Sequence, residues 1–232
     1  MMRWGWLAGL APLATPAEAC RLALVLALDV SSSVDAQEDA LQRQGLAAAL
    51  VAEDVAAAFF ASPDPVAVTI FEWSGRWNQV SLAPWTVIEG PDDLADLSAR
   101  VAGSLRSRDD LPTALGYALG HAAGLLQSGP SCLFSTIDVA GDGVSNEGFG
   151  PAEAYAAFPF EGVTVNGLVV NAADFEGEVD LIPFFREEVI RGPGAFIEVA
   201  NSFEDYEAAM RRKLIRELGT QMLGGGTRGN AG

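Results

Sequence analysis

The sequence has little histidine, cysteine and basic charge. Its 232 residues include one histidine, two cysteines and 14 lysines and arginines against 31 aspartates and glutamates, a formal net charge of -17. Binding to nucleic acid needs a basic footprint on the phosphate backbone, so this charge argues against nucleic acid, and against anionic membrane surfaces, as partners. The acidity itself indicates no more than good solubility.

The residues of common catalytic sites are also scarce. No Ser-His-Asp or Cys-His arrangement can be assembled, and no glycine-rich phosphate loop follows the first apolar run. The single histidine, His121, lies in an apolar helical segment, where we expect a packed or half-exposed core residue and not a catalytic base. The sequence therefore favours a protein that is not an enzyme.

Long hydrophobic runs are absent as well. The N-terminal apolar run, residues 4–13, is far shorter than the roughly 20 residues of a membrane-spanning helix. Arg3 precedes this run and the small-residue motif AEA follows it at 17–19, an order typical of a secretory signal peptide. We expect a cleaved signal peptide over 1–19, a periplasmic or secreted protein, and no membrane span. A buried N-terminal strand, a membrane anchor and a lipid-modified Cys20 are the alternatives.

The two cysteines stand at similar distances from two aspartates. Cys20 precedes Asp29 by nine residues, Cys132 precedes Asp142 by ten, and each cysteine opens an apolar run. If these runs are parallel neighbouring strands with both aspartates at one end, the cysteines meet at the other end, and strands about 4.8 Å apart suit a disulfide. An even cysteine count in an exported chain also favours a Cys20–Cys132 disulfide, with two independent buried thiols as the alternative.

Apolar, strand-like runs alternate with longer alanine-rich helical runs. We predict strands over 21–28, 66–73, 79–88, 132–139, 162–170 and 195–199, and helices over 35–60, 92–105, 112–127 and 203–222. A short polar turn, SGRWN, joins the second and third strands, so the third should be antiparallel and lie at an edge, where Pro84 is tolerated.

This alternation predicts the fold class α/β, with a doubly wound, mostly parallel six-stranded sheet, one antiparallel edge strand and helices on both faces. One domain should cover 20–223, and the glycine-rich tail 224–232 should be disordered.

The first strand ends in an unusual cluster of oxygen-bearing side chains, in the stretch LALDVSSSVD. Ligands of open parallel sheets bind beyond the carboxyl ends of the strands, and here Asp29, Ser31 and Ser33 follow one strand on alternate residues. Thr113 opens the helix in LPTALGYAL, and Asp142 follows a strand in DVAGDGVSN. The alternative is purely local: Ser33, with Asp35, could be a helix cap, and Asp142 a turn residue.

Two carboxylates and three hydroxyls without cysteine or histidine select a hard cation. We expect Mg²⁺, with Mn²⁺ and Ca²⁺ as the alternatives, and modest affinity because hydroxyls are weak ligands. Two carboxylates only just neutralise the ion, so an Asp or Glu carboxylate from a partner protein could complete its coordination.

These motifs resemble the metal-ion-dependent adhesion site (MIDAS) of von Willebrand factor A-type (VWA) domains over nearly the whole mature chain. The stretches LALDVSSSVD, FEWSG, DVAGDGVSNEG, VNGLVV and GPGAFIEVA further resemble an uncharacterised group of secreted bacterial proteins with this domain. The resemblance implies five parallel strands and one antiparallel edge strand with the metal at the top of the sheet.

The resemblance also implies that Ser31, Ser33 and Thr113 contact the ion directly or through water, while Asp29 and Asp142 act largely through bound water. In one departure from the family pattern, Leu111 stands where a glycine is usual two residues before the threonine, which puts mobility of this loop in doubt.

The function expected from these motifs is divalent-cation-dependent protein binding by a monomer. The alternatives are a metal-dependent hydrolase with Asp29 or Asp142 as base, and a structural domain with a vestigial site.

We also assign roles to three tryptophans and to two polar residues outside the oxygen cluster. We interpret Trp73, Trp77 and Trp85 as packing residues, with a sugar-contacting or partner-contacting surface as the alternative. We interpret Asn146 and Glu147, on the loop that follows Asp142, as solvated side chains, with side chains that face the site as the alternative.

Overall fold

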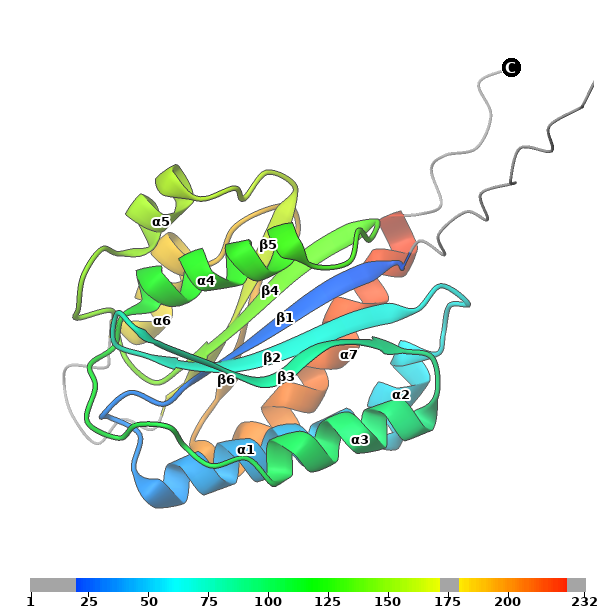
Figure 1. Ribbon diagram of the computed structural model, residues 1–232, viewed down its shortest axis with the longest axis horizontal. Helices are drawn as coiled ribbons and strands as arrows, with labels where there is room; N and C mark the ends of the chain where they lie inside the picture. The colour runs from blue at the N-terminus through cyan, green and yellow to red at the C-terminus, as the bar shows by residue number, and fades with distance from the viewer. Residues whose placement is uncertain (1–19, 172–179, 225–232) are drawn as a thin grey trace, which may run out of the picture.

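A computed structural model describes residues 20–171 and 180–224 (Figure 1). The predicted signal peptide lies outside the described residues, as does the predicted tail apart from Gly224, which ends the last helix.

Six strands form one sheet in the order β3-β2-β1-β4-β5-β6. They are β1 (Leu22–Asp29), β2 (Val66–Ser74), β3 (Asn78–Ile88), β4 (Phe134–Gly141), β5 (Val163–Val170) and β6 (Ile197–Ala200). Every neighbouring pair is parallel except β2 and β3. The predicted six-stranded sheet with one antiparallel edge strand is therefore confirmed.

The sequence of each strand suits its place in the sheet. Strand β1 is buried along its whole length, as expected of a central parallel strand that is covered on both faces. Strand β3 lies at the edge and its pairing with β2 shifts register between Val68 and Phe71, next to Pro84. A proline has no N–H to give to a ladder, so an irregular edge strand can accept it.

Helices cover both faces of the sheet. They are α1 (Ala36–Leu50), α2 (Glu53–Phe59), α3 (Pro91–Ala102), α4 (Leu115–Ser128), α5 (Pro151–Ala157), α6 (Leu181–Phe184) and α7 (Tyr206–Gly224), with a short π-helical turn, η2 (Phe185–Val189), and a 3-10 turn, η3 (Phe203–Asp205). In Figure 1, α1, α2, α3 and α7 lie on one face and α4, α5 and α6 on the other, and a separate apolar core fills each side.

The helix predictions were partly wrong. The predicted helix 35–60 breaks at Ala52, whose backbone is extended, and the second segment turns to bury Val55 and Phe59 in the core. The predicted helix 112–127 begins at Leu115, so Pro112 and Thr113 belong to the loop before it.

The predicted disulfide is confirmed. Strands β1 and β4 are parallel neighbours, and Cys20 is bonded to Cys132 with a Cα–Cα separation of 4.6 Å. The bond ties the two central strands together at their amino ends, so their carboxyl ends, on the left in Figure 1, meet at the opposite edge.

The interpretation of the tryptophans holds for two of the three. Trp73 is buried, and the Trp85 indole N–H donates a hydrogen bond to the Leu125 carbonyl at 3.2 Å. Trp77, in contrast, is 90% exposed on the turn between β2 and β3, so it is not a packing residue. His121 is a half-buried core residue, as predicted, with its ring centroid 4.8 Å from that of Phe71.

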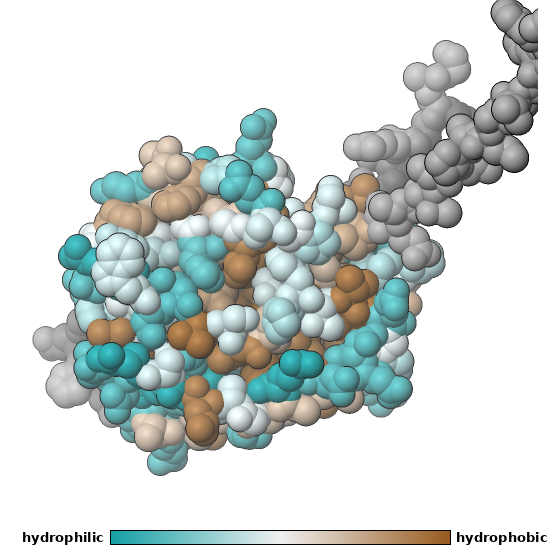
Figure 2. All heavy atoms as spheres, in the orientation of Figure 1, coloured by the Kyte–Doolittle hydropathy of each residue, from teal (hydrophilic) through white to brown (hydrophobic). Residues whose placement is uncertain are grey.

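The face of the molecule shown in Figure 2 carries no single large hydrophobic patch. In Figure 2, hydrophobic spots are separated by hydrophilic and neutral residues over the visible side. No helix within residues 20–171 and 180–224 is long and apolar enough to cross a membrane.

Candidate metal centre

The predicted metal-binding residues meet where the strand order reverses. The chain runs outward from β1 to β2 and later returns to β4 on the other side of β1, which makes the β1–β4 boundary the switch point of the sheet. Asp29 ends β1, Asp142 directly follows β4, and Thr113 lies two residues before α4. Ligands of such sheets bind at this boundary.

Hydrogen bonds link the side chains across these three loops. The Ser33 hydroxyl donates to Asp142 Oδ1 at 2.8 Å, and the Ser33 and Ser31 hydroxyl oxygens are 3.1 Å apart. The Thr113 hydroxyl donates to Ser31 Oγ at 3.2 Å, and Asp29 Oδ1 accepts the backbone N–H of Ser31 at 2.8 Å. The structure thus brings all five predicted residues into one polar cluster.

The N-terminal cap of α1 is Asp35 and not Ser33. The Oδ1 of Asp35 accepts the backbone N–H groups of Gln37 and Glu38, and the Glu38 carboxylate accepts the N–H of Asp35 in return. Such a capping box satisfies the helix terminus without help from a further residue. Ser33 instead directs its hydroxyl to Asp142.

Asp29 is only partly satisfied by its neighbours. Its side chain is buried, and its Oδ2 accepts no hydrogen bond from the described residues. Burial is the main cause that raises the pKa of Asp29 well above its ordinary value, and the charge of Asp142 raises it further. A buried carboxylate oxygen without a donor is costly, so this oxygen marks a place for a cation or an additional donor.

A glycine allows the loops to approach the cluster closely. A Cβ atom on Gly141 would lie 3.3 Å from Asp29 Oδ2 and 3.3 Å from the Phe185 ring, so a side chain there would crowd the buried carboxylate. Gly143, the next glycine, has Thr113 Oγ1 and Ser33 Oγ within 4 Å of its Cβ position. Small residues on both sides of Asp142 therefore leave room beside the oxygen cluster.

Asn146 is exposed, as expected of a solvated residue, and it also holds the threonine loop. Its side-chain Oδ1 accepts the backbone N–H of Thr113 at 2.9 Å, and its own N–H donates to the Thr113 carbonyl at 2.9 Å. Glu147 is not merely solvated either, because it pairs with Arg76 at 3.2 Å. An asparagine after an Asp-Gly turn gives no sequence signal of such a contact, since the partner is 33 residues away.

Replacing Asn146 with alanine should weaken cation binding about tenfold without unfolding the protein. The substitution removes the acceptor that fixes Thr113. Loss of a residue that orients a metal ligand typically lowers metal affinity by about one to two orders of magnitude. Calorimetric titration of both proteins measures the change. Equal affinities would show that Thr113 is positioned without Asn146.

The donor set fits a hard divalent cation. The cluster holds two carboxylates and three hydroxyls. It is therefore not a site of three or more His, Cys, Asp or Glu side chains, and the described part of the chain has no such site. A hydroxyl that donates its proton to a carboxylate, as Ser33 does, still has oxygen lone pairs with which it could bind a cation. Oxygen ligands of this kind suit Mg²⁺, Mn²⁺ or Ca²⁺ and disfavour softer metals.

Comparison with known proteins places the chain in a family. Residues 19–222 match the family described as "Protein of unknown function (DUF1194)". The chain belongs to the DUF1194 family. A comparison of this DUF1194 protein with curated proteins finds no match.

Solved structures show that this DUF1194 protein has the fold of a VWA-type domain. Proximal thread matrix protein 1 (PTMP1) from the mussel byssus is 18% identical with a TM-score of 0.61, over 87% of this chain and 48% of that one. The pilus adhesin SpaC from Lactobacillus rhamnosus GG is 14% identical with a TM-score of 0.61, over 86% of this chain and 31% of that one. The von Willebrand factor type A protein from Catenulispora acidiphila is 12% identical with a TM-score of 0.57, over 88% and 43%. This DUF1194 protein spans less than half of each of these three proteins, and at such identities the likeness concerns the fold alone.

Proposed function

We propose that this DUF1194 protein is an exported recognition module that binds a divalent cation and uses it to bind an acidic side chain of a partner protein. The observation that carries the proposal is that Asp29, Ser31, Ser33, Thr113 and Asp142 form one hydrogen-bonded cluster, which includes a buried Asp29 carboxylate oxygen without a donor among the described residues. A cation there would neutralise both carboxylates and satisfy Asp29 Oδ2.

Two of the structural neighbours support this function by analogy. One structure of PTMP1, 18% identical to this chain, is described with a zinc-occupied MIDAS motif, and SpaC is described as a pilus adhesin. The cation proposed for this chain is Mg²⁺, because an all-oxygen set with three hydroxyls suits a small hard ion, with Mn²⁺ and Ca²⁺ as the alternatives.

The proposed partner offers an Asp or Glu carboxylate. Two protein carboxylates balance the charge of a divalent ion, so the ion can still attract a third carboxylate from outside. We propose that the protein acts as a monomer in the periplasm or outside the cell, after removal of residues 1–19. The Cys20–Cys132 disulfide supports export, since disulfides persist mainly in oxidising compartments.

Titration calorimetry of Mg²⁺, Mn²⁺ and Ca²⁺ into the mature protein tests the metal site. We expect saturable binding, and a loss of affinity of at least about 30-fold in Asp29→Ala because the buried charge is removed. Asp96→Ala is the matched control, since Asp96 is an exposed carboxylate on α3 and its loss should leave the affinity unchanged. Absence of binding to the wild type, or equal binding by Asp29→Ala, would refute the proposed site.

Catalysis is not part of the proposal. His121 lies on α4 with its ring against Phe71, and burial lowers its pKa, so it is a packed side chain and offers no evident proton transfer to the oxygen cluster. Cation-stimulated hydrolysis of simple esters or phosphates that disappears in Asp142→Ala would replace recognition with a hydrolase function.

A further inference from the structure

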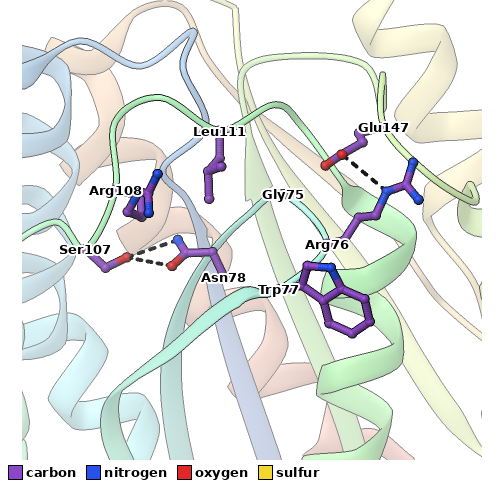
Figure 3. A pocket seen from close by; sticks show the side chains of 8 residues that line it. All are labelled: Gly75, Arg76, Trp77, Asn78, Ser107, Arg108, Leu111 and Glu147. Atoms are coloured by element: carbon purple, nitrogen blue, oxygen red, sulfur yellow. Dashed lines mark hydrogen bonds and ion pairs between the residues drawn. The ribbon is translucent and has the colours of Figure 1, made fainter.

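A cavity of about 420 Å³ lies beside the proposed metal site. Its walls come from the turn between β2 and β3 (residues 75–77), from Asn78 at the start of β3, from Ser107, Arg108 and Leu111 in the loop between α3 and α4, and from Glu147. In Figure 3, Leu111 lies between two pairs of side chains that line the cavity. Asn78 and Ser107 are joined by hydrogen bonds on one side of it, and Arg76 and Glu147 form an ion pair on the other. This volume falls in the range of pockets that bind ligand groups.

Trp77 is exposed at the edge of this cavity. Its side chain is 90% exposed, and its nearest aromatic contact is the edge of Tyr117, at a centroid distance of 6.3 Å. An exposed indole that the described residues do not cover is a large apolar surface in water, and tryptophan and arginine are the residues most enriched at energetic centres of protein interfaces. Leu111 adds a second apolar surface to the same cavity.

The cavity and the metal site share a segment of backbone. Leu111 lines the cavity and lies two residues before Thr113, so their Cα atoms are at most about 7 Å apart. The Ser32 N–H donates to the Leu111 carbonyl at 2.8 Å, and the Gly75 N–H donates to the Pro112 carbonyl at 2.7 Å. An extended chain advances about 3.3 Å per residue, so one bound segment could reach both places within about four residues.

The loop that carries Leu111 is anchored to the core. Arg43 is buried and forms ion pairs with Asp39 and Glu72, and its Nη1 donates to Ser104 Oγ at 2.7 Å. Glu72 accepts the backbone N–H of Ser107 at 2.8 Å. These contacts keep the cavity wall in place without a ligand, which reduces the ordering cost of binding.

The cavity carries two arginine side chains in a strongly acidic chain. Arg76 and Arg108 are about half exposed, in a chain whose formal net charge is -17. Each is paired with a partly exposed carboxylate, Arg76 with Glu147 and Arg108 with Asp110, and ion pairs at exposed positions are weak enough to be exchanged. A partner carboxylate near the cation would therefore meet two guanidinium groups where most of the chain would repel it.

We propose that this cavity binds a large apolar or aromatic side chain of the same partner whose carboxylate binds the cation. This inference rests on the proposed function, and it specifies the partner as a protein segment with an Asp or Glu and, within about four residues, a Phe, Tyr, Trp, Leu, Ile or Met. The apolar side chain packs on Trp77 and Leu111, and Arg76 and Arg108 lie at the rim.

Selection from a library of random short peptides displayed on phage tests the proposal. The mature protein is immobilised in Mg²⁺, bound phage are eluted with EDTA, and enriched peptides are synthesised. We expect them to share an acidic residue with a large apolar residue within about four positions, and to bind Trp77→Ala at least about tenfold more weakly. Leu133→Ala is the matched control, because Leu133 is 61% exposed beside Cys132 at the opposite end of β4, and it should bind as the wild type does.

The other outcomes separate the two proposals. Peptides that share only the acidic residue and bind Trp77→Ala with full affinity would overturn the cavity proposal and leave the proposed function standing. In a further outcome, the protein binds Mg²⁺ in calorimetry and yet enriches no peptide that EDTA elutes. That result would overturn recognition of an acidic segment, and with it the cavity proposal. Binding of neutral oligosaccharides that depends on Trp77 and persists in EDTA would also overturn it and assign the cavity to sugars.

Discussion

Replacing both Cys20 and Cys132 with alanine is expected to lower the free energy of unfolding by about 4 to 5 kcal/mol. The two cysteines are 112 residues apart, and closing a loop of about 100 residues removes unfolded-state entropy of this size in the chain-entropy model. The bond also joins the two central strands of the sheet, β1 and β4, at their amino ends. Urea unfolding of the wild type and the double variant, both without reductant, measures the difference.

Cation binding should survive this double substitution. The disulfide lies at the amino ends of β1 and β4, and the eight residues of β1 place Asp29 about 25 Å away. Equal affinities in the folded double variant would agree with that separation. An unchanged unfolding midpoint would contradict the stability prediction, and a folded variant that no longer binds the cation would mean that the disulfide supports the site from a distance.

The sheet and the oxygen cluster could be predicted because their signals are local. A buried parallel strand is a continuous apolar run, and in this chain the runs that become β1 and β4 lead directly into Asp29 and Asp142. Once the strands are placed side by side, the topology brings the carboxyl ends together without any knowledge of side-chain contacts. The same reasoning located the disulfide at the other end, because the distances from cysteine to aspartate are similar in the two strands.

Features that depend on distant contacts could not be predicted. The break between α1 and α2 at Ala52 lies in an alanine-rich run with good helix propensity, and it occurs because Val55 and Phe59 must reach the core. Helix α5 is only seven residues long and is held by packing against α4, so it has too few turns for a periodic pattern. The exposure of Trp77 depends on the turn after β2, where nothing in the described chain covers the indole.

Replacing Lys213 with methionine is expected to lower the free energy of unfolding by about 3 to 5 kcal/mol at about pH 8. Lys213 is the single lysine of the chain, and its side chain on α7 is fully buried. Its ammonium nitrogen lies 2.7 Å from Asp138 Oδ1 on β4 and 2.7 Å from Glu217 Oε1. Methionine has a similar volume, so the variant removes the cation and leaves two buried carboxylates without one.

The effect of this substitution should depend strongly on pH. Burial is the main cause that raises the pKa of Asp138 from 3.8 to about 7; Lys213 opposes the shift and Glu217 adds to it. Between about pH 4 and pH 7 folded Asp138 therefore holds a proton that the unfolded chain has lost, and its contribution to stability falls as pH rises through this window. At about pH 5, Asp138 is protonated in both folded proteins, so removing Lys213 should cost much less there than at about pH 8.

Urea-unfolding midpoints of the wild type, Lys213→Met, Asp138→Asn and the double variant, at about pH 5 and about pH 8, test this account. Asp138→Asn should flatten the decline in stability with pH, because it removes the group that titrates. In the Lys213→Met background the same change should restore part of the lost stability at about pH 8, since it removes one of the two uncompensated charges. A loss in Lys213→Met that is equal at both pH values, and that Asp138→Asn does not relieve, would mean that Lys213 stabilises α7 by packing of its aliphatic stem and not by its charge.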